Sequence, residues 1–170
     1  MNKQEQLNIF DRWISEYRPL LFKVVRAYAF TSVDQDDLFQ EISIQVWRSI
    51  PNFKEKSKVS TWLYRIALNV ALNWKRKHKK HEEGRQSLQQ VEHILEHAEE
   101  EVDERLDWLY REITKLDKID RSITLLMLDG FGYKEMAEIL GISESNIGVK
   151  IHRIKKHLTE QSQKPEHHAI

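Results

Sequence analysis

The chain of 170 residues contains no cysteine and has only five glycines and three prolines. Without cysteine it can build neither a disulfide framework nor a thiolate metal site. Few glycines and prolines, in a sequence with long helical periodicities, favour helices over sheets. The predicted fold class is therefore all-α.

Long apolar runs are also missing. No stretch approaches the ~20 apolar residues that a membrane-spanning helix needs, and residues 1–13 lack the apolar core of a signal peptide. The sequence holds no glycine-rich phosphate loop, no Ser-His-Asp arrangement and no nucleotide-binding motif. We therefore expect a cytoplasmic protein that does not insert into membranes, is not an enzyme and needs no cofactor.

Charge of one sign does not dominate, since 27 basic side chains balance 27 acidic ones. A neutral chain at first argues against a nucleic-acid partner, but the distribution reverses that argument. Residues 54–80 hold nine lysines and arginines and one acid, whereas residues 81–120 hold thirteen acids and five bases. Residues 144–165 are basic again. Two basic segments that flank an acidic one predict nucleic-acid contact.

Helical periodicity divides the chain into two lobes. We expect a first helical domain over residues 1–80, a flexible acidic linker over 81–104, a second helical domain over 105–162 and a tail over 163–170. The linker contains Gly84 and loses the apolar repeat there. The predicted architecture is two small helical domains joined by that linker.

The first domain shows three helical segments. Residues 10–28 form one, which Pro19 bends or restarts. Residues 34–50 follow a capping cluster at 32–34, and residues 60–80 form the third helix. The apolar residues expected in the core are Leu38, Ile42, Val46 and Ile50 in the second helix and Leu63, Ile66, Ala67, Val70 and Trp74 in the third.

The third helix carries a second stripe beside its apolar one. Its members are Trp62, Arg65, Asn69, Asn73 and Arg76. Amides and guanidinium groups can contact bases or phosphates, and tryptophan can stack on an exposed base. The alternative is a solvated face with one semi-buried tryptophan. Three lysines in the preceding loop favour nucleic-acid contact: Lys54, Lys56 and Lys58.

Residues 133–158 of the second domain have the pattern of a helix-turn-helix. Gly141 ends the first helix, Ser143 caps the second, and Ala137 with Ile147 lets the two pack closely. The expected core residues are Met136, Ala137 and Leu140, then Ile147, Ile151, Ile154 and Leu158. The candidates for DNA contact are Ser145, Asn146, Val149, Lys150, His152, Arg153 and Lys156. A hairpin of helices that only packs is the alternative.

Two clusters of polar residues could suggest catalysis or metal binding, but neither has the partners that such a site needs. One is the acidic group at the start of the second helix: Asp34, Asp36, Asp37 and Glu41. These carboxylates suit a helix N-terminus and have no histidine or lysine partner for nuclease work. The other is the pair His93 and His97, half of a zinc site at best, among glutamates. We predict no catalytic residue and no metal site.

Three segments in this order, DQDDLFQEISIQVWRSI, STWLYRIALNVALNWKRK and GYKEMAEILGISESNIGVKIHRIKKHL, resemble a known family. They are similar to bacterial RNA polymerase sigma factors of the extracytoplasmic-function (ECF) group, over residues 17–158. The resemblance implies a non-catalytic subunit that directs core polymerase to specific promoters and assists DNA melting. It also implies that the acidic linker threads channels of the polymerase and that an anti-sigma factor controls the protein.

The resemblance assigns roles to the candidate residues. The first domain corresponds to sigma region two and the second to region four. Core polymerase would bind Asp37, Leu38, Gln40 and Glu41, with Trp47 in the core. The minus-ten element would meet Lys54, Lys56, Lys58, Trp62, Arg65, Asn69, Asn73 and Arg76. The minus-thirty-five element would meet Ser145, Asn146, Val149, Lys150, His152, Arg153 and Lys156.

The second helix of the helix-turn-helix, which would read the minus-thirty-five element, departs from the family's commonest pattern. It has Gly148 and Val149 where many relatives carry basic or hydroxyl residues. Glycine inside a helix costs ~1 kcal/mol relative to alanine, which indicates a close approach at Gly148. Val149 suits a thymine methyl group. Two other functions compete with initiation: a duplex-binding regulator that works without polymerase, and a helical adaptor. The stripe around Trp62 argues against the duplex-binding regulator, and the polarised charge argues against the adaptor.

Overall fold

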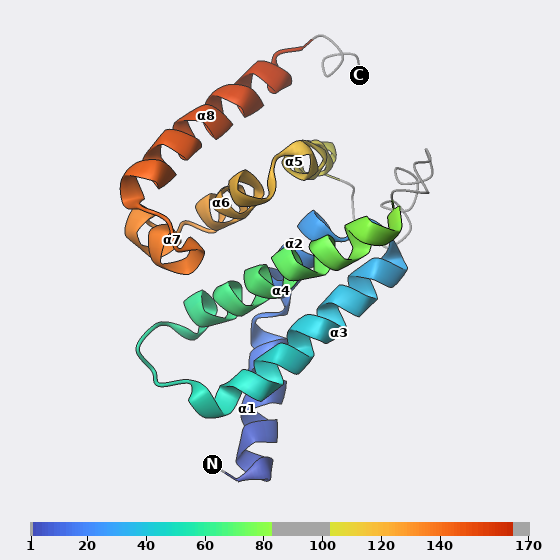
Figure 1. Cartoon of the computed structure of the whole chain (residues 1–170), viewed down its shortest axis with the longest axis vertical. Coiled ribbons are helices and arrows are strands. Elements are labelled where there is room, and N and C mark those ends of the chain that lie inside the picture. Colours follow the sequence, from blue (N-terminus) through green and yellow to red (C-terminus); the bar gives the residue numbers. More distant parts are fainter. Residues whose placement is uncertain (1, 83–102, 165–170) are drawn as a thin grey trace. The chain divides into compact units, whose positions relative to one another are not determined.

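The computed structural model describes residues 2–82 and 103–164 (Figure 1). For residues 75–82 it describes the backbone alone. The described residues form helices, and no β-strand occurs among them. The prediction of an all-α protein is therefore confirmed. The expected linker over 81–104 lies almost wholly outside the described residues, together with His93 and His97.

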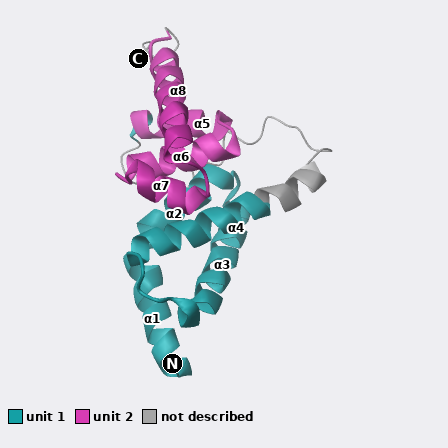
Figure 2. Cartoon of the chain, turned by 60° about the vertical axis from the view of Figure 1, so that its left-hand side comes forward, with its two compact units in different colours: residues 1–104 teal, residues 105–170 magenta. Residues whose placement is uncertain are grey.

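The chain divides into two compact units, residues 1–104 and residues 105–170 (Figure 2). The helices of the first unit are α1 (Lys3–Glu16), α2 (Arg18–Tyr28), α3 (Ser32–Ser49), the short 3-10 helix η1 (Ile50–Asn52) and α4 (Val59–Glu82). The helices of the second are α5 (Glu104–Lys115), α6 (Lys118–Leu128), α7 (Tyr133–Leu140) and α8 (Glu144–Ser162).

The helix expected over residues 10–28 is two helices that meet at Tyr17. Pro19 lies in the first turn of α2, where its missing N–H removes no helical hydrogen bond. The proline therefore restarts the helix. α1 begins earlier than expected because Asn2 and Glu5 form a reciprocal capping box, with bonds of 2.8 and 2.9 Å.

α3 also begins earlier than expected. The Thr31 hydroxyl, and not the cluster at 32–34, caps it by accepting a hydrogen bond from the backbone N–H of Asp34 at 3.1 Å. The apolar stripe predicted along this helix is confirmed, because all four members are buried: Leu38, Ile42, Val46 and Ile50.

The buried face of α4 differs from the predicted stripe. Leu63, Ala67 and Trp74 are buried as expected, but Ile66 and Val70 are only half-buried. The positions fully buried in addition are Tyr64, Leu68 and Ala71. The cause is that α4 packs against both α2 and α3, so its core-facing side is wider and turned from the predicted one.

In the second unit α8 packs on α6 and α7. Ile147, Ile151 and Ile154 are buried as predicted, and Leu158 is half-buried. The turn is also confirmed: Gly141 has a φ of 70°, and the Ser143 hydroxyl accepts from the N–H of Asn146 at 3.2 Å. In α7 the buried residues are Met136 and Ile139, whereas Ala137 and Leu140 are half-buried.

A buried arginine joins α6 to the end of α5. Arg121 is 2% exposed, and its Nη2 donates to the carbonyl oxygens of Thr114 and Leu116. These carbonyls belong to the last turn and end of α5, where helical partners are lacking. Arg121 therefore fixes the approach to the helix-turn-helix.

Candidate DNA- and polymerase-binding surfaces

The exposed side of α4 presents Arg65, Asn69 and Asn73. At about 100° per residue they lie opposite the wide buried face of the helix. The Nδ2 of Asn73 donates to the backbone carbonyl of Asn69 at 2.9 Å, so part of this amide is already engaged. Arg76 follows on the same helix, but its side chain lies outside the described residues.

Trp62 belongs to a three-membered aromatic cluster. Its ring centroid lies 5.5 Å from that of Trp13 in α1 and 5.0 Å from that of Phe53, which follows η1. Trp13 and Phe53 meet edge to face at 5.2 Å. Trp62 is half-buried, so protein contacts occupy much of the ring expected to stack on a base. These contacts anchor Trp62 at the start of α4, and its stacking on a base stays a prediction.

The aromatic cluster fixes both flanks of the lysine-rich loop. Phe53 precedes the loop and Trp62 follows it in the first turn of α4. Between them, Lys54, Lys56 and Lys58 are all exposed. Glu55 has a φ of 54°, in the left-handed region that few non-glycine residues adopt. A short loop held at both flanks therefore presents three ammonium groups to solvent, a suitable track for phosphates.

α3 presents the residues expected to bind polymerase, with one exception. Asp37 and Gln40 are exposed, and Glu41 is half-buried. Leu38 is fully buried with 0% exposure. The expectation that Leu38 contacts a partner is therefore wrong, because its side chain packs in the core of the unit. Leu38 instead holds α3 in place, so that the exposed side of this helix is presented to solvent.

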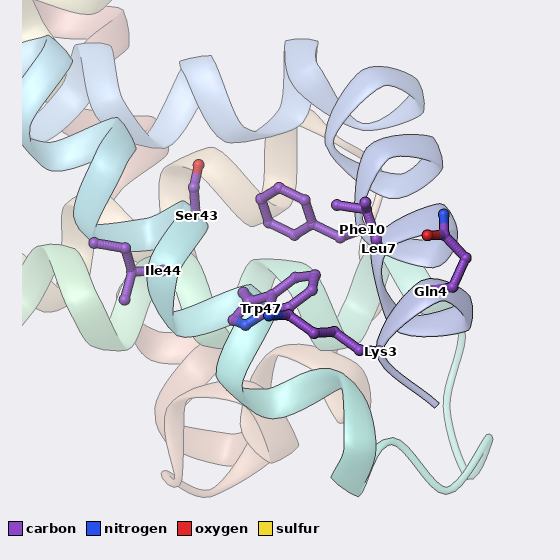
Figure 3. A pocket seen from close by; sticks show the side chains of 7 residues that line it. All are labelled: Lys3, Gln4, Leu7, Phe10, Ser43, Ile44 and Trp47. Carbon is purple, nitrogen blue, oxygen red and sulfur yellow. The ribbon is translucent and has the colours of Figure 1, made fainter. Parts of the chain in front are cut away.

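An apolar groove between α1 and α3 was not predicted from the sequence. Its volume is about 680 Å³, and its lining residues are Lys3, Gln4, Leu7, Phe10, Ser43, Ile44 and Trp47 (Figure 3). Phe10 meets Trp47 edge to face at 5.5 Å, and the Nε2 of Gln6 donates to the Trp47 carbonyl at 2.7 Å. Trp47 is thus half-buried at a groove wall, not enclosed in the core.

The groove leaves large apolar side chains in contact with solvent. Leu7 is 40% exposed and Ile44 is 50% exposed. Ile44 lies one helical turn after Gln40, so the groove continues the polar surface of α3. The sequence carried a signal for this groove: Leu7 and Phe10, like Ile44 and Trp47, are spaced by three residues. That spacing gives each helix a second apolar patch beside its core stripe.

The outward face of α8 carries most of the residues predicted to read DNA. Those that are exposed are Ser145, Asn146, Val149, His152, Arg153 and Lys156. The Nζ of Lys156 lies 3.9 Å from Oε1 of Glu160, one turn later on the helix. Both side chains are exposed, so solvent screens this pair strongly. Lys150 is the exception, because its Nζ lies 2.6 Å from Asp120 Oδ1 of α6. Lys150 is therefore paired within the protein, and its predicted contact with DNA stays a prediction.

Tyr133, the first residue of α7, adds to this face and was not predicted from the sequence as a DNA contact. It is 48% exposed and its ring lies against Gly148 of α8. An exposed tyrosine hydroxyl beside the exposed polar and basic side chains of α8 suits a phosphate or sugar contact. The signal was its place at the N-terminus of α7, a helix capped by Gly132 and Glu135.

Two further properties follow from the described residues. A helix that crosses a membrane must be both long and apolar, and no helix within 2–82 or 103–164 combines the two. No cluster of three histidine, aspartate or glutamate side chains that could hold a metal ion occurs in those ranges.

Comparison with known proteins matches both units. Residues 13–81 match the model of Sigma-70 region 2, and residues 106–158 match that of Sigma-70 region 4. The ECF RNA polymerase sigma factor SigW of Bacillus subtilis is 30% identical over 171 residues, which cover 94% of this chain and 91% of SigW. The RNA polymerase sigma factor SigZ of the same organism is 29% identical over 150 residues, covering 86% and 82%.

Two solved structures share the fold. A structure of the sigma factor RpoE of Bartonella quintana with the anti-sigma factor NepR has a TM-score of 0.69 at 19% identity, covering 89% of this chain and 94% of RpoE. CnrH, in a structure with the cytosolic domain of CnrY, has a TM-score of 0.65 at 19% identity, covering 91% and 88%.

The helical first unit with its basic loop and polar stripe, and the helix-turn-helix of the second, define a transcription factor of the sigma class. The family matches are more specific. The chain belongs to the ECF RNA polymerase sigma factors, and it acts in promoter-specific transcription initiation.

Proposed function

We propose a division of labour among three surfaces of this sigma factor. The outer side of α3 docks on core polymerase, the exposed side of α4 with its preceding loop engages the minus-ten element as it opens, and α8 reads the minus-thirty-five element. In this proposal residues 1–80 work as region two, and residues 105–162 as region four. The factor supplies contacts and no catalytic group, and it acts in the cytoplasm with the polymerase.

One observation carries the assignment of opening to the first unit. Arg65 and Asn69 stand on the exposed side of α4, and the lysine-rich loop beside them is held by the aromatic cluster of Trp13, Phe53 and Trp62. A rigid basic loop beside donors that can contact bases suits single-stranded DNA. A regulator that binds only duplex DNA has no need of such a surface.

The polymerase-binding surface combines polar and apolar parts. Asp37 and Gln40 offer exposed polar groups, and Ile44 continues the same side of α3 into the apolar groove. Exposed apolar patches next to polar residues are typical of protein interfaces. We infer that core polymerase covers this whole strip, from Asp37 to Trp47.

Control by a protein inhibitor is a second part of the proposal. The two solved relatives were each captured with a binding protein, and one of these is an anti-sigma factor by name. An anti-sigma factor that covers the apolar groove and α3 would block polymerase binding directly. The groove's exposed Leu7 and Ile44 support such a competitor.

The deciding experiment mixes the purified chain with core polymerase free of other sigma factors. We expect the two to elute together in size-exclusion chromatography. The complex should also transcribe from a subset of a random upstream-sequence pool, and core polymerase alone should not. Separate elution, or transcription that does not depend on the added chain, would refute the proposal. A duplex-only regulator predicts separate elution.

A further inference from the structure

Asp120 of α6 and Lys150 of α8 form an ion pair that joins the two helices. Lys150 Nζ donates to Asp120 Oδ1 at 2.6 Å, across thirty positions of sequence. The two side chains are 24% and 21% exposed, so solvent screens this pair far less than a fully exposed one. Asp120 is itself fixed, since its backbone N–H donates to the Asp117 cap at 2.9 Å.

Lys150 lies at the edge of the DNA-facing side of α8. It precedes the buried Ile151 directly and stands one turn before the exposed Arg153. If α8 meets DNA as proposed, a lysine at this flank has the reach to meet a phosphate next to the one that Arg153 contacts. The ammonium group of Lys150 can therefore bind either the carboxylate of Asp120 or a phosphate of the DNA backbone.

Which of the two anions Lys150 binds affects the affinity of the protein for DNA. Sequence-independent affinity grows with each phosphate that a free cation neutralises, because counterions are released. A lysine already paired with a carboxylate brings no net charge to the backbone. Breaking a short, mostly buried pair to reach a phosphate exchanges one ionic contact for another and leaves the carboxylate unpaired.

We propose that Asp120 neutralises Lys150 and thereby lowers the affinity of α8 for DNA of any sequence. This inference rests on the proposed function of α8 as the DNA-reading helix. The exposed Arg153 and Lys156 then supply the phosphate contacts, and Lys150 does not. Lower sequence-independent affinity makes a polymerase subunit more specific, because the genome presents a large excess of non-specific sites.

The test measures the salt dependence of binding for the full-length chain. Fluorescence anisotropy with a fluorescein-labelled mixed-sequence duplex gives the affinity at a series of KCl concentrations. We expect Asp120→Asn to free Lys150, raise low-salt affinity and steepen the slope of log affinity against log salt by about 1. Lys150→Gln should keep the wild-type slope, and the double variant Asp120→Asn with Lys150→Gln should return to it.

A purely structural ion pair predicts a different pattern. Both single variants would then loosen α8 and weaken binding, and neither would steepen the slope. A Lys150→Gln slope lower by about 1 would also overturn the proposal, because it would show that Lys150 meets DNA despite Asp120. This outcome decides the matter even if Asp120→Asn does not fold, which thermal unfolding would reveal.

Arg153→Gln is the control that separates this inference from the proposed function. If α8 meets DNA, this variant should flatten the slope by about 1. A wild-type slope for Arg153→Gln would refute α8 as the DNA-binding helix, and the role of Asp120 with it. A flattened slope for Arg153→Gln, beside an unchanged slope for Asp120→Asn, would overturn the Asp120 proposal alone.

Discussion

The ring of Tyr133 lies against Gly148, so that a Cβ atom at Gly148 would stand 3.5 Å from Tyr133 Cε2. That distance is an ordinary van der Waals contact. The glycine therefore permits the approach of α7 to α8 but is not required for it. Contacts within the chain do not demand glycine here, because alanine fits at this position. A close approach by another molecule stays a prediction.

Gly148→Ala should stabilise the second unit by roughly 0.5–1 kcal/mol, because alanine loses less backbone entropy than glycine in a helix interior. Urea unfolding of the full-length chain, followed by circular dichroism, measures the change. A bulkier substitution, Gly148→Leu, should displace the ring of Tyr133 and lose this gain. A destabilised Gly148→Ala would show that the contact is tighter than ordinary packing.

Gly141→Ala is the matched control for this measurement. The change of side chain is the same, but Gly141 has a φ of 70° in the turn between α7 and α8. An L-residue with a Cβ is less stable there by about 1–2 kcal/mol. The two alanine variants should therefore shift stability in opposite directions.

Substitutions on α3 should separate docking from folding. Gln40→Ala together with Glu41→Lys should weaken the complex with core polymerase and leave the urea midpoint close to wild type. Leu38→Ala should lower the free energy of unfolding by roughly 2–5 kcal/mol, because Leu38 is fully buried. Titration of labelled core polymerase measures the affinity of each variant.

Ile44→Ser extends this test to the apolar groove. Ile44 is 50% exposed, so its replacement should cost little stability. If polymerase covers the groove, affinity should fall as it does for the Gln40 and Glu41 variant. Wild-type affinity for both variants would remove this side of α3 from the polymerase interface, whereas a loss confined to Gln40 and Glu41 would exclude only the groove.

Local patterns in the sequence predicted much of the fold. Gly141 and Ser143 indicated the turn because few residues fit their positions as well. Gly141 adopts a left-handed backbone conformation, and the Ser143 side chain caps α8. The α3 stripe was predicted in full because one face of that helix is buried at a regular spacing. The error in α4 has a physical reason: two helices pack on it, so Tyr64 and Leu68 are buried outside a single helical stripe.

The sequence could not predict contacts between distant positions. The aromatic cluster brings Trp13 to Trp62, and the ion pair brings Asp120 to Lys150, across separations that no helical repeat encodes. Arg121 is buried because the carbonyls at the end of α5 need a donor, a requirement visible only in three dimensions. The roles of the exposed residues on α3, α4 and α8 remain predictions.

Phe53→Ala should disturb the lysine-rich loop from the side that does not meet DNA. Phe53 contacts both Trp13 and Trp62, and aromatic pairs contribute about 0.5–1.5 kcal/mol each beyond the area that they bury. We expect lower stability of the first unit and slower promoter opening. Phe22→Ala is the control, since it removes the stacked Phe22–Phe39 pair and leaves the cluster intact. Equal loss of opening in both would argue against a role for the cluster in holding the loop.

The exposed side of α4 offers the sharpest test of initiation. Arg65→Ala and Asn69→Ala should leave closed-complex formation largely intact, because duplex binding by α8 does not involve them. They should impair the open complex, in which bases leave the stack and meet this surface. Asn73→Ala should have a smaller effect, since part of its amide already binds the Asn69 carbonyl. The promoter used is one selected from the random pool with reconstituted holoenzyme.

Permanganate footprinting of unpaired thymines measures the open complex, and a gel shift under conditions that keep the duplex closed measures the first step. Reduced footprints with a normal gel shift place Arg65 and Asn69 in DNA opening. If both variants give wild-type footprints, the exposed side of α4 has no part in melting, and the lysine-rich loop becomes the remaining candidate. If the gel shift falls in parallel with the footprint, these residues bind duplex DNA, and the division of labour between the two units is wrong.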